Sequence, residues 1–133
     1  MRKMKMMALI TCMGLASLMP MKSQAMTESS MGLCKITAYC PCRICSGDFK
    51  DTTATGRTAR SGHTVAVDPD KIAYGTILKI GDHEYVAEDC GRHVKGDHID
   101  IYFDSHEEVE EFGKKYKTVW IIGRNWRWPE GEE

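Results

Sequence analysis

Three aspartates, Asp68, Asp89 and Asp100, stand in or at the end of stretches that otherwise have the composition of β-strands. Asp100 lies between two isoleucines in "HIDIYF", residues 98–103, where strand chemistry disfavours aspartate. Side chains alternate between the two faces of a strand, so Asp100 lies opposite the flanking isoleucines. We therefore expect Asp100 to point away from the core, onto a polar and aromatic surface where a carboxylate is available for chemistry.

The elements that must position these acids are mostly strands. β-branched and aromatic residues alternate with polar ones between segments rich in turn residues. Gly81-Asp82 separates two such stretches and predicts a two-residue hairpin. Residues 41–62, rich in Cys, Gly, Thr and Ser, are predicted to form a loop. The predicted strands are residues 34–40, 64–68, 75–80, 83–89, 98–103 and 117–123.

One short helix is predicted over about residues 105–113. Ser105 and Glu108 have the spacing of a capping box, and Gly113 is a suitable helix end. Together these elements predict a mostly-β domain, a small barrel with one short α-helix.

The first 25 residues have the features of a secretory signal peptide. A basic start precedes an apolar stretch over residues 6–19, and Ser23-Gln24-Ala25 has the small residues of a cleavage site. Lipidation at Cys12 is a weaker alternative, because Thr11 precedes it and the apolar stretch before it is short. We therefore predict a signal peptide (1–25), a flexible leader (26–32), a folded domain (33–123) and a C-terminal tail (124–133), in a protein secreted to the extracellular space or cell wall.

Charge argues against nucleic acid as a partner. Four of the 18 Lys and Arg residues and none of the 19 acids lie in the predicted signal peptide, so its removal moves the formal net charge from −1 to −5. Nucleic-acid binding requires a basic surface. The remaining 108 residues fit one small domain. We expect a monomer with no membrane span.

Five cysteines remain after the signal peptide: Cys34, Cys40, Cys42, Cys45 and Cys90. Disulfides are the favoured interpretation for a secreted domain, although an odd number leaves at least one thiol unpaired. The spacing of Cys40, Cys42 and Cys45 also permits a zinc site, with Cys34 or Cys90 as fourth ligand. Free thiols are the third possibility. No metal and no cofactor are expected.

A long run of residues resembles a known family. The run "TATGRTARSGHTVAVDPDKIAYGTILKIGDHEYVAEDCGRHVKGDHIDIYFDSHEEVEEFG" is similar to the three-aspartate (3D) domain family of cell-wall enzymes, which is related to membrane-bound lytic transglycosylase A. The segment "TAYCPCRIC" resembles further members of the family. The three aspartates of the family correspond to Asp68, Asp89 and Asp100. The resemblance implies a double-psi β-barrel that acts on peptidoglycan glycan strands.

The resemblance also implies a reaction. Asp100 corresponds to the catalytic acid, which cleaves the β-1,4 bond between N-acetylmuramic acid and N-acetylglucosamine and leaves a 1,6-anhydro end. Ordinary glycosidases need two carboxylates, whereas an internal hydroxyl nucleophile needs only one. That acid must start protonated near neutral pH. We expect repulsion from Asp68 and Asp89 to raise its pKa.

Four further residues are predicted to contact substrate. Tyr39 and Tyr102 have rings that can stack on sugars, and His98 shares the strand face of Asp100. Lys95 matches a Lys-Gly pair of the family. The sequence departs from the family's Asp-Thr-Gly-Gly pattern, because Arg92 ends the corresponding run and is placed to crowd the cleft or to contact a peptide-stem carboxylate.

Other classes of function remain open on the sequence. Asp89, His93, His98 and Asp100 could bind zinc in an amidase or peptidase, although no metalloprotease signature is present. Cys90 with His93 or His98 could form a Cys/His hydrolase. A non-catalytic peptidoglycan-binding module is the third alternative, because fold does not determine function. The tail beyond Gly123, with Trp126 and Trp128, is expected to be loose rather than a glycan- or membrane-binding surface.

Overall fold

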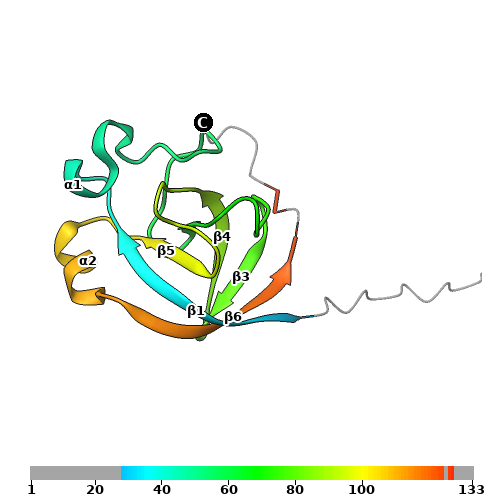
Figure 1. Ribbon diagram of the computed structural model, residues 1–133. Helices are drawn as coiled ribbons and strands as arrows, with labels where there is room; N and C mark the ends of the chain where they lie inside the picture. Colours follow the sequence, from blue (N-terminus) through cyan, green and yellow to red (C-terminus); the bar gives the residue numbers. More distant parts are fainter. Residues whose placement is uncertain (1–27, 125, 128–133) are drawn as a thin grey trace, which may run out of the picture.

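The computed structural model describes residues 28–124, 126 and 127. Its framework consists of β-strands (Figure 1). The strands are β1 (Ser29–Tyr39), β2 (Thr64–Ala66), β3 (Ile77–Ile80), β4 (His83–Asp89), β5 (His98–Tyr102) and β6 (Lys115–Gly123). The helical elements are α1 (Arg43–Ser46), the 3-10 turn η1 (Gly47–Phe49) and α2 (His106–Phe112).

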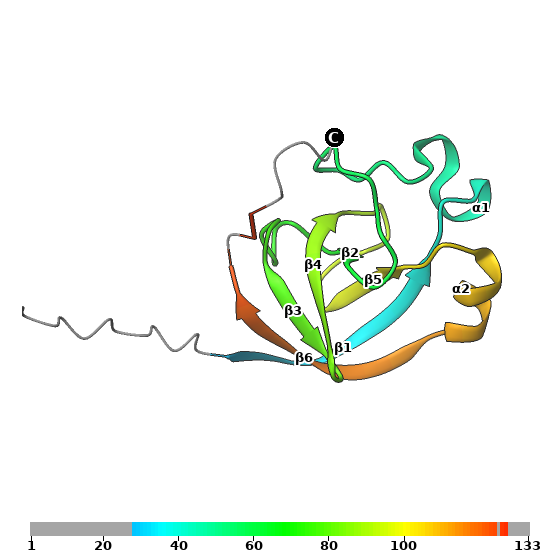
Figure 2. The same ribbon diagram turned by 180° about the vertical axis from the view of Figure 1, so that it is seen from behind.

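The strands close into a barrel in the order β1-β5-β2-β4-β3-β6. The pairs β1/β5 and β2/β4 are parallel, and the other neighbouring strands are antiparallel. The view from behind shows that α1 and α2 lie at the same end of the barrel (Figure 2). The predicted small, mostly-β barrel is confirmed, and the predicted short helix is α2.

Aliphatic side chains from all six strands fill the barrel. Ile36 of β1, Ile99 of β5 and Val119 of β6 are fully buried there. Because strand side chains alternate, their neighbours Thr37 and Asp100 point to the outside of the barrel. The parallel register pairs Thr37 directly with Asp100, and this pairing positions the candidate site.

The local signals of the sequence are found where expected. The Ser105 side chain accepts a bond from the Glu108 amide, and the Glu108 side chain accepts from the Ser105 amide, which completes the predicted capping box of α2. Gly113 ends the helix. Gly81 has a positive φ of 62° in the turn between β3 and β4, a conformation that favours glycine.

Three predictions about segments need correction. β1 begins at Ser29, so residues 29–32 are not a flexible leader but pair with β6, with a register shift at Gly32. The predicted loop 41–62 contains α1 and η1. Trp126 is not loose: its amide donates to the Gly75 carbonyl at 2.9 Å, and its ring lies 5.3 Å from that of His63.

The predicted signal peptide and Trp128 lie outside the described residues. Within the described part of the chain, every helix is too short to cross a membrane.

Candidate active site

A cleft of about 910 Å³ lies against the outer surface of the barrel. Its strand residues are Tyr39, Ala66, Asp89 and Asp100. Residues of α1, η1 and the loop that follows them, between 43 and 54, and loop residues 90–94 form the surrounding walls. The structure therefore brings two of the three aspartates, Asp89 and Asp100, into one cleft.

Asp100 is half-buried in this cleft, not exposed as the sequence predicts. The cleft walls cover the strand face that we expected to be open. Burial raises the pKa of Asp100 to about 6, while a hydrogen bond from Thr37 opposes the shift and the Asp89 carboxylate adds to it. The main cause is thus desolvation, whereas repulsion from Asp89 is a smaller contribution and Asp68 plays no part.

A chain of hydrogen bonds runs from Asp100 to a buried histidine. Thr37 Oγ1 lies 2.8 Å from Asp100 Oδ1 and 2.7 Å from His98 Nε2. His98 Nδ1 lies 3.0 Å from the His93 carbonyl oxygen, which only accepts, so Nδ1 carries a hydrogen. The protonation of Asp100 and that of His98 are therefore coupled through Thr37.

The Thr37 hydroxyl has one hydrogen for two partners. If Asp100 is ionised, Thr37 donates to it, and His98 Nε2 must donate to Thr37 as part of an imidazolium. If Asp100 is protonated, it donates to Thr37, which donates to a neutral imidazole. Burial lowers the pKa of His98 and raises that of Asp100. Both shifts favour the second arrangement, in which Asp100 holds the proton.

Asp89 holds the cleft together through both carboxylate oxygens. Oδ2 accepts from the Tyr39 hydroxyl at 2.8 Å. Oδ1 accepts from the amides of Ala54 and Cys90, each at 2.9 Å. Burial, and then the Asp89 carboxylate, raise the pKa of Tyr39 well above its ordinary value, so the phenol remains a donor. Asp89 therefore joins β1, β4 and the loop around Ala54.

Asp68 lies outside the cleft lining. Its Oδ1 accepts from the Asp70 amide at 3.1 Å and its Oδ2 from the Gly96 amide at 2.9 Å. The bond from Gly96, followed by that from Asp70, lowers the pKa of Asp68. This carboxylate fastens the turn after β2 to the loop before β5.

Of the four predicted substrate-contacting residues, the structure places only Tyr39 in the cleft lining. Tyr102 is 3% exposed and packs edge-on against Tyr39, with ring centroids 5.3 Å apart. His98 is buried and reaches the cleft only through Thr37. Lys95 is exposed but does not line the cleft. Tyr102 and His98 thus support the site from behind and are not available to stack on a sugar.

Several residues in or behind the cleft were missed in the sequence. Thr37 precedes Tyr39 by two residues, so the alternation of the predicted strand 34–40 already places both on one face. Ile44 and Phe49 are 84% and 78% exposed in the cleft wall, which a loop composition does not reveal. Positive charge surrounds the same opening, from Arg43, Lys50 and Arg92.

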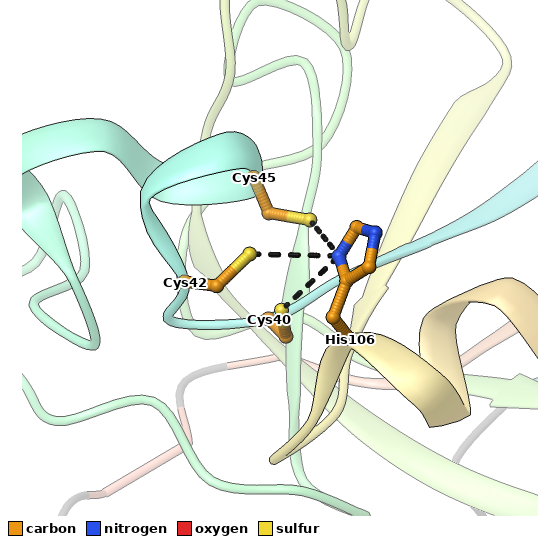
Figure 3. A group of neighbouring side chains, drawn as sticks. All are labelled: Cys40, Cys42, Cys45 and His106. Atoms are coloured by element: carbon orange, nitrogen blue, oxygen red, sulfur yellow. Dashed lines mark hydrogen bonds between the residues drawn. The ribbon is translucent and has the colours of Figure 1, made fainter.

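The cysteines do not form the predicted disulfide, because all five in the described residues are free thiols. Cys40, Cys42 and Cys45 instead surround His106 (Figure 3). Within the described part of the chain, these four side chains lie close enough together to share a metal ion. The set considered for a metal-dependent amidase, Asp89, His93, His98 and Asp100, does not converge in this way.

Comparison with known proteins shows what these residues are similar to. Residues 63–123 match the sequence model of the 3D domain. The "Putative cell wall shaping protein YabE" of Bacillus subtilis (strain 168) is 32% identical over 91 residues, which cover 65% of this chain and 21% of that protein. The chain therefore spans about a fifth of the length of this curated relative.

Solved structures of the lytic transglycosylase MltA from Escherichia coli align with part of the chain. One has 26% sequence identity and a TM-score of 0.48, and a variant in an apo form has 23% identity and a TM-score of 0.49. Each match covers 55% of this chain and 27% of the other. Asp68, Asp89 and Asp100 all fall within the residues matched by the family model. Residues 63–123 of the chain are thus similar to the 3D domain.

Proposed function

We propose that this protein is a secreted peptidoglycan lytic transglycosylase that acts in the cell wall. The observation that carries the proposal is Asp100, a half-buried carboxylic acid of the cleft with a pKa raised to about 6. A general acid works best when its pKa lies near the working pH. The 3D domain and a relative described as shaping the cell wall support the choice of substrate.

In the proposed reaction Asp100 serves twice. Its proton moves to the oxygen of the β-1,4 bond between N-acetylmuramic acid and N-acetylglucosamine, and that bond breaks. The muramic C6 hydroxyl attacks C1 of its own ring, and its proton moves to the Asp100 carboxylate. The acid is regenerated and no water is consumed. A second catalytic carboxylate is not needed, which fits the engagement of both Asp89 oxygens in positioning bonds.

The cleft has the size and lining that such a polymer requires. Its volume of about 910 Å³ is in the range of ordinary ligand sites and suits a short stretch of glycan. The exposed Phe49 ring can pack against the apolar face of a sugar. Arg43, Lys50 and Arg92 can pair with the lactyl-peptide carboxylates of the stems. We expect the protein to work on these strands as a monomer.

The product identifies the reaction. We expect purified peptidoglycan incubated with the protein to release muropeptides with 1,6-anhydro ends, which mass spectrometry distinguishes from reducing ends because they are lighter by one water. Reducing ends would identify a hydrolase, and cleavage of stem-peptide amides would identify an amidase or peptidase. Binding to the polymer without any release would identify a non-catalytic module.

Replacing Thr37 with valine is expected to move the alkaline limb of the activity profile upward by about one pH unit, because a hydrogen bond that favours ionised Asp100 is lost. Wild-type activity should fall as pH rises through about 6, where Asp100 loses its proton. Initial rates measured across pH test both statements. Thr37→Ser keeps the hydroxyl and should keep the wild-type profile. An unchanged limb in Thr37→Val would remove Thr37 from the proton chain.

A further inference from the structure

Three thiols and one imidazole converge where β1 ends and α2 begins (Figure 3). His106 Nδ1 lies 3.5 Å from the Sγ of Cys42, 3.5 Å from that of Cys45 and 3.8 Å from that of Cys40. All four ligand atoms lie within 4.8 Å of one another. The four residues come from two segments more than 60 positions apart, so chain proximity alone does not explain the cluster.

Hydrogen bonding does not account for this geometry. A neutral imidazole nitrogen has either one hydrogen or one lone pair, so Nδ1 can satisfy one thiol but not three. A tetrahedral zinc ion, about 2.3 Å from sulfur and about 2.0 Å from nitrogen, places the nitrogen about 3.5 Å from each sulfur. The observed distances therefore match the edges of a zinc coordination tetrahedron.

The surroundings of the four residues fix their orientation. His106 Nε2 lies 3.5 Å from the Glu110 carboxylate, one helical turn further along α2. Metal-binding histidines typically direct their second ring nitrogen to a carboxylate, which leaves the other nitrogen free as a ligand. The Ser46 hydroxyl donates to the Cys40 carbonyl at 2.6 Å, and the Ser46 amide to the Cys42 carbonyl at 2.9 Å. These bonds hold the cysteine loop in its curved form.

We propose that Cys40, Cys42, Cys45 and His106 bind one Zn²⁺ ion in a structural site. Soft thiolates with one imidazole in a tetrahedral arrangement are the ligand set that zinc prefers. Binding releases the three thiol protons, so the occupied centre carries one net negative charge. Four protein ligands leave no open position for substrate, and the ion therefore has a structural role. The sequence indicated the three cysteines, but the fourth ligand is His106 and neither Cys34 nor Cys90.

The proposed zinc site would hold one wall of the catalytic cleft in place. Cys40 follows Tyr39, which bonds to Asp89, and Cys45 itself lines the cleft. Neither α1 nor η1 contains a buried residue, so packing contributes little to holding this wall. A metal bound between this loop and α2 would supply the missing anchor.

Metal analysis tests the proposal directly. The protein, purified with reductant from cells supplied with zinc, should contain one zinc per chain. Co²⁺ in its place should give the intense visible absorption and the sulfur-to-cobalt charge-transfer bands of a tetrahedral thiolate site. Cys42→Ser and His106→Gln should lose these signals. Cys90→Ser should keep them, because Cys90 is an exposed thiol outside the cluster. Zinc absent from the reduced wild type, or retained equally by all three variants, would overturn the site.

A matched pair of substitutions on the surface of α2 controls for unfolding. Glu110→Gln removes the carboxylate that faces His106 and should weaken zinc binding about tenfold in competition with a chromophoric chelator. Glu111→Gln makes the same change at the next exposed position and should not alter the affinity. Equal affinities in the two variants would contradict the role of Glu110, and with it the assignment of Nδ1 as the ligand atom.

Discussion

Replacing Asp100 with asparagine is expected to reduce the rate of release of anhydro-muropeptides by about 10²–10⁴-fold. Asparagine has nearly the same shape but can neither donate the proton to the glycosidic oxygen nor accept one from the C6 hydroxyl. Rates with purified peptidoglycan, followed by mass spectrometry, measure the effect. Asp104→Asn is the control, because Asp104 is an exposed carboxylate just beyond the same strand.

The same variant should be more stable than the wild type at neutral pH, which separates lost chemistry from a lost fold. Folding raises the pKa of Asp100 from 3.8 to about 6. The favourable contribution of Asp100 to the free energy of unfolding is therefore complete below about pH 4 and is lost as pH rises through about 6. Asparagine avoids burying a charge. We therefore expect the free energy of unfolding to be higher than that of the wild type by roughly 1–3 kcal/mol at pH 7, and this difference to disappear near pH 4. Wild-type turnover in Asp100→Asn would refute the role of Asp100.

Removing the proposed zinc ion should lower turnover by about 10²-fold while the barrel stays folded, because small displacements of positioning groups cost this much. A helix of four residues is not stable alone, and α1 has no buried residue to hold it. Trypsin reports on this wall, since Arg43 and Lys50 are cleavage points within it. We expect cleavage there after treatment with a chelator and protection in the metal-bound protein.

Restoring zinc provides the control for this experiment. Both turnover and trypsin resistance should return when Zn²⁺ is added back to the reduced protein. Circular dichroism should show that the strands persist throughout. Trypsin resistance that does not change with the chelator would mean that the loop is held by something other than the metal.

Features that depend on short stretches of chain were predictable. The capping box of Ser105 and Glu108 and the turn at Gly81 involve neighbours in sequence, and both are found in the structure. The alternation around Asp100 correctly placed it opposite the core isoleucines. The alternation of side chains along the strand could not predict that this outer face is covered, because the covering loops are distant in sequence.

The remaining errors share this cause. β1 extends to Ser29 because β6 supplies a partner, although residues 29–32 carry no strand signal of their own. His106 has no motif in the sequence, and it becomes a candidate ligand only when α2 packs beside the end of β1. Thr37 gains its importance from the register between β1 and β5. Each feature depends on a tertiary pairing that composition and spacing do not encode.

The pairing of β1 with β6 also bears on how the domain folds. β1 has β5 on one side and β6 on the other, so strands near opposite ends of the described chain must meet before the barrel can close. Pairings between residues so distant in sequence form slowly, typically in milliseconds to seconds. A newly made chain therefore has no complete native state until β6 has been synthesised.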